Sequence, residues 1–327
     1  MKNLFKNLSL LFISISLTIV VLEFFLRLIG HIPFKYFNSN SPHQSIYKVD
    51  KKLGWTNKKG IYSSNIDNNI ISYKFLEDGS RYTGFDLKKN LSEKKIILIG
   101  GSFTLGEAIN DEETFAYQLQ KNLNAYEIKN FGVGGYGTYQ SYLKLLNIFE
   151  ANEKIDYVIY PFIDHHEIRN IGDASWLEFI SKHARAPVHM PYVKLDKKNN
   201  IVEYSPIKYL VLPLSNYSVL ITKIQKKIMR MYLFSKNKDM KLITKKLIIK
   251  MNELSQKNNS KFIFVNLSSD KLKVSDYEKF SLENDIQFIN CQIELNNKHT
   301  VQDDVHPNGL ANKKYSFCIL NAMFMKE

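Results

Sequence analysis

Residues 96–106 read IILIGGSFTLG, and this stretch decides the expected fold. Its first four residues are apolar and mostly β-branched, and two glycines follow, which is typical of a buried strand that ends in a tight turn. A helix is expected downstream over residues 114–123, because the acidic residues 111–113 stand near its start. Strand, glycine turn and helix together indicate one unit of a parallel α/β sheet.

The same alternation continues towards the end of the chain. Further strands are expected at residues 128–131, 157–160, 262–265 and 286–289, and Pro161 is expected to close the second of these. Further helices are expected at residues 138–149, 239–256 and 307–324. Strands that alternate with helices predict an α/β fold, in which a short parallel sheet lies between two layers of helices.

Two parts of the chain depart from this rhythm. Residues 31–93 are polar and rich in Asn, Ser, Lys and Tyr, so they are interpreted as a stalk and an N-terminal extension. Residues 94–327 form the α/β domain, with an insertion at about 171–239 that contains an expected hairpin over 192–204. A basic segment follows the hairpin. This segment is interpreted as a solvated helical face, and the alternatives are a cover for the site and a surface that touches the membrane. Its cations are Lys223, Lys226, Lys227, Arg230, Lys236 and Lys238.

Residues 1–30 predict a membrane anchor. A helix over residues 8–28 would cover 21 residues at about 1.5 Å each, enough for a hydrocarbon core of about 30 Å. Lys2 and Lys6 precede it, which favours a cytoplasmic N-terminus, and no small-residue cleavage pattern follows it. We therefore expect a single-pass membrane protein whose remaining chain is extracytoplasmic, either periplasmic or at the cell surface.

The net charge, the single acidic residue of the span and the two cysteines each permit one further expectation. The net charge is +13, from 45 Lys and Arg against 32 Asp and Glu, but the cations are spread along the chain, so we expect a solvated basic surface and no nucleic-acid partner. Within the span, Glu23 is expected to reach the interface or to pair with Arg27 at i+4. Cys291 and Cys318 are compatible with one disulfide in an oxidising compartment and with two buried thiols.

Three polar or glycine-rich segments fall at expected strand ends, where ligands bind in open α/β sheets. In the first, Ser102 follows a strand and precedes a helix, and small neighbours leave its hydroxyl accessible. Backbone N–H groups at such a turn can face a developing anion. Gly-Gly-Ser is also a common turn, so this segment alone does not establish a nucleophile.

The second segment, residues 130–137, is rich in glycine. Its glycines allow a loop to pass close to a ligand. Gly132, Gly134 and Gly137 also spell GxGxxG, which favours a dinucleotide-binding alternative. In dinucleotide-binding folds that motif stands at the first βα turn, and an acidic residue follows about 20 residues further on. Here the motif stands at the second βα turn, and Asp164 is 27 residues beyond Gly137.

The third segment holds Asp303 and His306, three residues apart. A tight turn can bring both side chains to one site, where the carboxylate orients the imidazole and the imidazole takes a proton from a serine. The alternative is a surface turn that caps the last helix.

Together the three segments resemble the SGNH, or GDSL-like, hydrolase superfamily, from about residue 94 to the C-terminus without the insertion. Gly101 stands where the family name has Asp, and this exchange looks like one that is common in membrane-anchored bacterial members. Residues 53–55 and 78–81 also resemble segments that precede the first block in those members. The resemblance implies a flavodoxin-like three-layer fold. It also implies that Ser102 is the nucleophile and His306, oriented by Asp303, the base, and that the N–H groups of Ser102 and Gly135 bind the oxyanion.

The third family block departs from its pattern. The family has an Asn whose side chain donates to the oxyanion, whereas residues 162–170 read FIDHHEIRN. Counting back from Arg169 puts His165 at that position, with Asp164 as the other candidate. A neutral histidine can donate through one ring nitrogen, and losing one such donor lowers a rate by about 10²–10³.

These features predict an ester hydrolase or acyl-ester transferase that needs no metal and no cofactor. The run His165-His166-Glu167 with His306 suggests a metal site, but adjacent residues rarely converge on one ion and no i, i+4 pair is present. Partners implied are the membrane and an acylated carbohydrate or small ester. The alternatives are a weakly active or inactive accessory protein in polysaccharide assembly and, less favoured, a nucleotide-binding enzyme.

Overall fold

The computed structural model describes residues 2–35, 46–66, 69–85, 94–151, 153–183, 188–233, 237–302 and 304–324. Its centre is a five-stranded parallel sheet with the strand order β11-β10-β7-β5-β6. The strands are β5 (Lys94–Leu98), β6 (Tyr126–Asn130), β7 (Tyr157–Phe162), β10 (Lys261–Asn266) and β11 (Gln287–Asn290). All five were expected from the apolar runs, since β-branched runs of this length favour buried strands.

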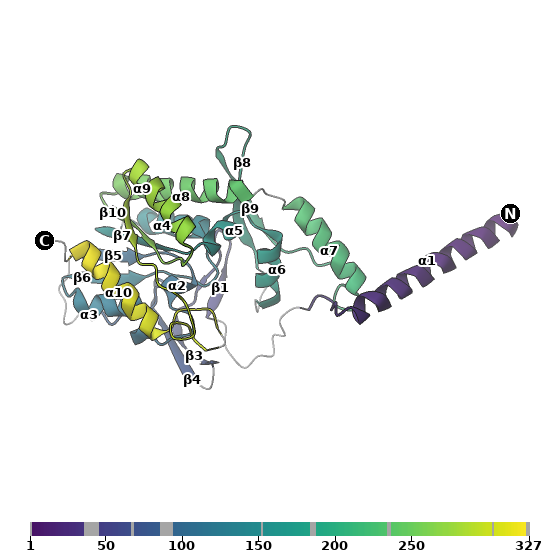
Figure 1. Cartoon of the computed structure of the whole chain (residues 1–327), viewed down its shortest axis with the longest axis horizontal. Helices are drawn as coiled ribbons and strands as arrows, with labels where there is room; N and C mark the ends of the chain where they lie inside the picture. The colour runs from purple at the N-terminus through teal and green to yellow at the C-terminus, as the bar shows by residue number, and fades with distance from the viewer. Residues whose placement is uncertain are drawn as a thin grey trace.

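Helices cover both faces of the sheet, which confirms the three-layer α/β architecture (Figure 1). Ile96 and Leu98 pack with α3 (Phe115–Asn122) and α10 (Gly309–Phe324) on one face. Ile97 and its neighbours on the other strands pack on the opposite face. The helices on that face are α4 (Thr138–Glu150), α8 (Asn237–Lys257) and α9 (Lys271–Glu283).

The strand order places a topological switch point beside β5. Counted along the chain, the five strands lie in the order 2-1-3-4-5, which is flavodoxin-like, and the order reverses between β5 and β7. In such sheets ligands bind in the crevice outside the carboxyl ends of the strands at this point. The one-turn helix α2 (Ser102–Leu105) begins there, immediately after β5.

Pro161 does not close β7 as expected but lies inside it, paired with Val265 of β10. A proline lacks an N–H group and so removes a ladder hydrogen bond from a strand. The last pair between β5 and β7 joins Leu98 with Ile159, so Pro161 lies beyond the part of β7 that β5 flanks. The edge position created by the short β5 therefore accommodates the proline.

The N-terminal extension is folded on the domain as two antiparallel pairs. These are β1 (Tyr47–Asp50) with β2 (Gly54–Asn57), and β3 (Gly60–Ile66) with β4 (Asn69–Phe75). Arg81 is fully buried behind them, and its Nε donates to Asp111 Oδ1 at 2.6 Å. Asp111 begins the 3-10 turn η1 (Asp111–Glu113), so this pair ties the extension to the α/β domain.

The predicted hairpin of the insertion is confirmed as β8 (Met190–Leu195) with β9 (Ile201–Ile207). The same segment forms α6 (Ala174–His183) and α7 (Val219–Tyr232), and α5 (His165–Asn170) precedes it. Leu177, Met190, Val193 and Met229 share a core with Leu247 of α8. The insertion is therefore packed on the helical layer of the main domain.

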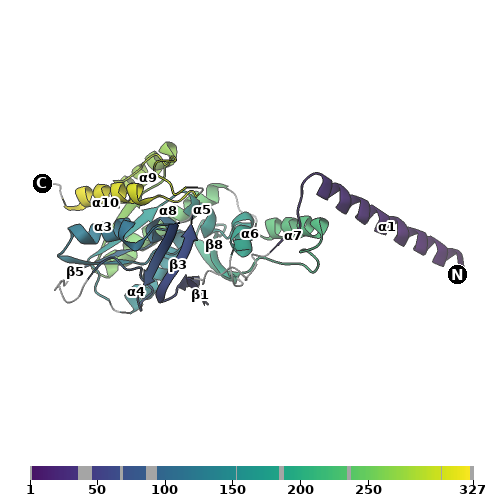
Figure 2. The same ribbon diagram turned by 90° about the horizontal axis from the view of Figure 1, so that it is seen from below.

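Two further expectations concern the ends of the chain. The predicted span is helical, as part of α1 (Lys2–Leu28), and residues 3–28 are long and apolar enough to cross a membrane. Figures 1 and 2 show α1 projecting away from the domain beyond α7. Near the other end Cys291 and Cys318 are disulfide-bonded, which ties the segment after β11 to α10.

Candidate active site

A pocket of about 1290 Å³ lies at the carboxyl ends of the strands. It gathers residues from all three segments singled out in the sequence: Ser102 after β5, Gly135 after β6, and His306 before α10. His165, after β7, also lines it. Asp303 lies outside the described residues.

Ser102 is the first residue of α2, and only 3% of its surface is exposed. Its carbonyl oxygen accepts from the N–H groups of Gly106 and Glu107, which closes the turn. Ser102 is one of the residues that line the pocket. A buried serine that lines a pocket is positioned to meet a substrate.

Gly101 precedes it with no room for a side chain. A Cβ atom there would lie 2.7 Å from Nε2 of His166, 3.0 Å from the carbonyl oxygen of Tyr136 and 3.3 Å from Nη1 of Arg169. His166 and Arg169 both belong to α5, so this helix fills the space that an aspartate at position 101 would take. A residue with a side chain at position 101 would therefore require these neighbours to shift.

The two α5 side chains differ in charge. His166 is fully buried, and burial first, with Arg169 and His165 adding to it, holds its pKa well below the ordinary value, so its imidazole is neutral. Its Nδ1 lies 2.8 Å from the hydroxyl of Tyr160. Burial lowers the pKa of Arg169 to about 10, so this guanidinium keeps its charge at neutral pH. Arg169 lines the pocket, and its guanidinium lies 4.4 Å from the ring centroid of Trp176.

His306 is held by a carboxylate two residues earlier. Its Nδ1 lies 2.5 Å from Oδ1 of Asp304, and the same oxygen accepts the backbone N–H of His306 at 2.9 Å. The second bond curls the chain into an Asx-type turn that presents the carboxylate to the ring. The hydrogen bond from His306 lowers the pKa of Asp304 although burial opposes this, so Asp304 is ionised and Nδ1 of His306 carries the proton.

Glu107, which no sequence pattern indicated, faces the other nitrogen of the same ring. Its Oε2 lies 3.7 Å from Nε2 of His306. Burial lowers the pKa of His306, but the bond to Asp304 and the charges of Glu107 and Asp304 outweigh it, so the pKa is raised. Neutral His306 has its lone pair on Nε2, inside the pocket that Ser102 also lines.

The glycines of the second segment are closely packed, so a Cβ atom added at these positions would meet neighbouring backbone or side-chain atoms. A Cβ at Gly132 would lie 2.6 Å from the carbonyl carbon of Thr104 in α2, and one at Gly137 would lie 2.8 Å from Cβ of Arg169. Close packing against α2 and α5 accounts for these two positions without a bound phosphate. Gly135 has a φ of +82°, and its Cβ would lie 3.1 Å from Trp55, so a glycine is required on both grounds.

His165 and Asp164, the two candidates for a third oxyanion donor, lie at the start of α5. His165 is exposed and lines the pocket, and its part as an oxyanion donor stays a prediction. Asp164 precedes it as the N-cap residue, with Oδ2 at 3.5 Å from Nζ of Lys273 on α9. Both candidates line the pocket, and the burial of His166 and Arg169 beside them is a feature of the folded chain.

Comparison with protein-family models finds no match, and comparison with curated proteins finds none at a significant level. Solved structures with a similar chain path include a lipolytic protein of the G-D-S-L family from Veillonella parvula. It is 12% identical with a TM-score of 0.43, and the likeness covers 72% of this chain and 100% of that chain. The psychrotrophic esterase EstA from Pseudoalteromonas sp. is 11% identical with a TM-score of 0.41, over 71% and 97% of the two chains. AlinE4, an SGNH-hydrolase family esterase, is 10% identical with a TM-score of 0.33, over 60% and 74%.

Proposed function

We propose that this chain is a serine ester hydrolase or acyl-ester transferase, with Ser102 as nucleophile and His306 as base. One observation carries the proposal: Ser102 and His306, from opposite ends of the domain sequence, line one pocket, and an ionised carboxylate binds Nδ1 of His306. Serine hydrolases are recognised by this division of roles rather than by the order of the residues in the chain.

In the proposed reaction Nε2 of His306 takes the proton from Ser102 Oγ as the oxygen attacks the ester carbonyl carbon. The N–H groups of Ser102 and Gly135, with His165 as a third donor, stabilise the negative oxygen of the tetrahedral intermediate. The intermediate collapses to an acyl-serine, and His306 returns the proton to the departing alcohol. Water or a sugar hydroxyl then releases the acyl group by the same steps, which restores the free serine.

Two carboxylates are candidates for orienting His306. Asp303 matches the resemblance, and Asp304 makes the bond to Nδ1 in the described part of the chain. We assign the orienting role to Asp304 on that contact and keep Asp303 as the alternative. The two are separated by a mutational test in the Discussion.

The proposed substrate is an O-acylated carbohydrate outside the cytoplasm. The resemblance supports the substrate class, and two features support the location. The first is α1, with its length and apolar composition. The second is the disulfide between Cys291 and Cys318, since disulfides persist mainly in oxidising compartments.

The test is hydrolysis of a short-chain p-nitrophenyl ester by the full chain in detergent. Ser102→Ala is expected to lower kcat by about 10⁴-fold or more, as loss of the nucleophile does in serine hydrolases. A fluorophosphonate probe is expected to label the wild type and not the variant. Equal hydrolysis and equal labelling in the two would overturn the enzyme assignment and favour the accessory protein, which the altered third block also favours.

A further inference from the structure

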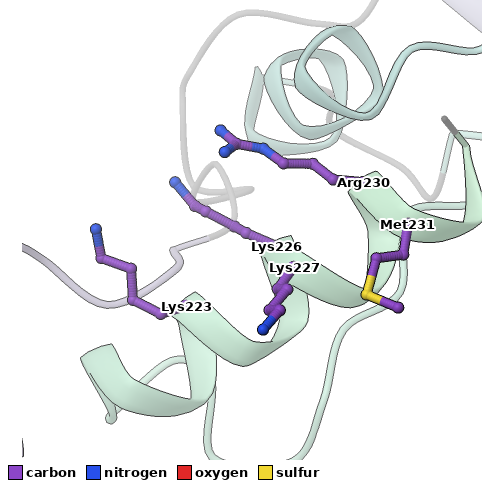
Figure 3. A pocket seen from close by; sticks show the side chains of 5 residues that line it. All are labelled: Lys223, Lys226, Lys227, Arg230 and Met231. Atoms are coloured by element: carbon purple, nitrogen blue, oxygen red, sulfur yellow. The ribbon is translucent and has the colours of Figure 1, made fainter. Parts of the chain in front are cut away.

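The helix α7 carries a surface that the proposed chemistry does not use. Its sequence holds four cations and no acidic residue. Lys223, Lys226 and Arg230 extend along one side of the helix, while Lys227 and Met231 lie on another (Figure 3). Together these five residues line a hollow of about 760 Å³. Among the described residues Lys226 alone of the four cations meets a carboxylate, Glu178 of α6 at 2.8 Å.

Beside the cations α7 exposes an apolar stripe. Ile224, Ile228 and Met231 are 46%, 42% and 71% exposed, and their spacing of four and three residues puts them on one face. The opposite face holds Val219, Thr222, Gln225 and Met229, which are buried against the domain. The helix α7 thus packs one face on the protein, exposes an apolar face, and carries its cations between the two. This composition is typical of a helix that lies in a membrane interface.

The end of the expected span is bonded to this helix. The carboxylate of Glu23 accepts from the backbone N–H groups of Val219 at 2.9 Å and Leu220 at 3.0 Å, and from the hydroxyl of Ser218 at 2.8 Å. These N–H groups belong to the first turn of α7, where no partner exists within the helix. Arg27 closes the contact, bonding both Glu23 and the carbonyl oxygen of Tyr217.

This contact fixes the depth of α7. Glu23 precedes the last residue of the span, Leu28, by five residues, which is about 8 Å of helix. If α1 crosses the bilayer, the N-terminus of α7 therefore stands at the boundary between hydrocarbon and headgroups. Figures 1 and 2 show α7 between α1 and the rest of the domain, the place where a membrane surface would meet the protein.

We propose that α7 docks on the bilayer that holds α1, with Ile224, Ile228 and Met231 in the acyl boundary and Lys223, Lys227 and Arg230 on the phosphates of anionic lipids. The proposal rests on the proposed membrane span and is independent of the esterase chemistry. Each cation close to an anionic surface is worth about fivefold in surface affinity, so three of them make the docking dependent on lipid charge.

The experiment uses the full chain reconstituted in vesicles, with an environment-sensitive NBD fluorophore on Ile228→Cys and doxyl lipids as quenchers. The described cysteines are already paired, so the introduced thiol is labelled selectively. In vesicles that contain phosphatidylglycerol the label is expected to emit at shorter wavelength and to be quenched. The matched control is Leu282→Cys on α9, 78% exposed and away from α7, whose label is expected to remain in water.

The charge dependence is tested in the same background by Lys223→Gln, Lys227→Gln and Arg230→Gln together. Quenching is expected to fall to the level found in phosphatidylcholine vesicles, while the equal charge change at Lys257, Lys271 and Lys279 leaves it unchanged. Quenching that is equal in both lipids and insensitive to the α7 substitutions would overturn the anionic-lipid assignment. A label at position 228 that behaves like the one at position 282 would overturn docking altogether.

Vesicle flotation after an alkaline wash distinguishes the membrane span of α1 from the docking of α7. A chain that stays with the vesicles while the position-228 label remains in water contradicts docking but keeps the span. A chain that washes off contradicts the span, and docking with it. Neither outcome bears on the esterase assignment, which is measured on the detergent-solubilised protein.

Discussion

The Nδ1 atom of His306 lies 2.5 Å from Oδ1 of Asp304, and that same oxygen accepts the backbone N–H of His306. One carboxylate thus fixes the turn and the ring together. Because Asp304 is ionised, it holds His306 in the tautomer whose Nε2 is free to take a proton.

Asp304→Asn is expected to lower kcat for p-nitrophenyl ester hydrolysis by about 10³–10⁴-fold, because an amide in place of the carboxylate disfavours the productive tautomer. Asp303→Asn is the matched variant and is expected to leave at least a tenth of the activity. Steady-state kinetics on the two proteins measures this. A large loss in Asp303→Asn with activity retained in Asp304→Asn would return the orienting role to Asp303.

The kcat/KM for ester hydrolysis is expected to rise with pH through a pKa above the ordinary histidine value, because the pKa of His306, the proposed base, is raised and only a neutral imidazole can accept the proton. Glu107→Gln removes one charge that raises this pKa, so the acid limb of the kcat/KM profile is expected to move to lower pH. Glu112→Gln removes an exposed charge elsewhere and is expected to leave the limb in place. An unchanged limb in Glu107→Gln would contradict the influence of Glu107 on His306.

Gly101→Ala is expected to destabilise the fold by about 1–3 kcal/mol, because its Cβ would overlap Nε2 of His166 and the carbonyl oxygen of Tyr136. The thermal midpoint in detergent reports the loss. In a His166→Ala background the same change is expected to cost less, since the nearest of the obstructing atoms is gone. An equal loss in both backgrounds would show that His166 is not the obstacle.

Arg81→Ala is expected to destabilise by about 3–5 kcal/mol, because it leaves Asp111 without its buried partner at the junction of the extension and the domain. The exposed pair of Lys59 and Glu77 provides the comparison, and Lys59→Ala is expected to change stability by less than about 1 kcal/mol. Thermal unfolding of the two variants distinguishes them. Similar small losses in both would mean that the extension does not depend on Arg81.

Much of the fold follows from the sequence because strands and helices are encoded by local patterns. The β-branched run at residues 96–99 and its four counterparts specify buried strands, and each stands in the sheet. The prediction that Pro161 ends its strand is wrong. Whether a proline interrupts a strand depends on which neighbouring strand flanks it, and β5 does not extend as far as Pro161. The helices α5 and α6 were not expected. Each is short, and α6 buries Leu177 and Ile180 only through packing on the insertion and the domain.

The alternation of strands with helices, the place of Ser102 after a strand, the place of His306 before the last helix and the long apolar helix at residues 2–28 all follow from local sequence patterns. These are properties of neighbouring residues, which periodicity and turn chemistry record. Three contacts are visible only in the folded chain: Asp304 binds His306, Glu107 faces the other nitrogen of that ring, and α5 crowds the position that a side chain at Gly101 would take. These contacts depend on side-chain orientation and on elements that folding brings together from distant parts of the chain, which local patterns do not record. The same holds for Glu23, a lone charge in an apolar helix whose partners on α7 lie nearly 200 residues away.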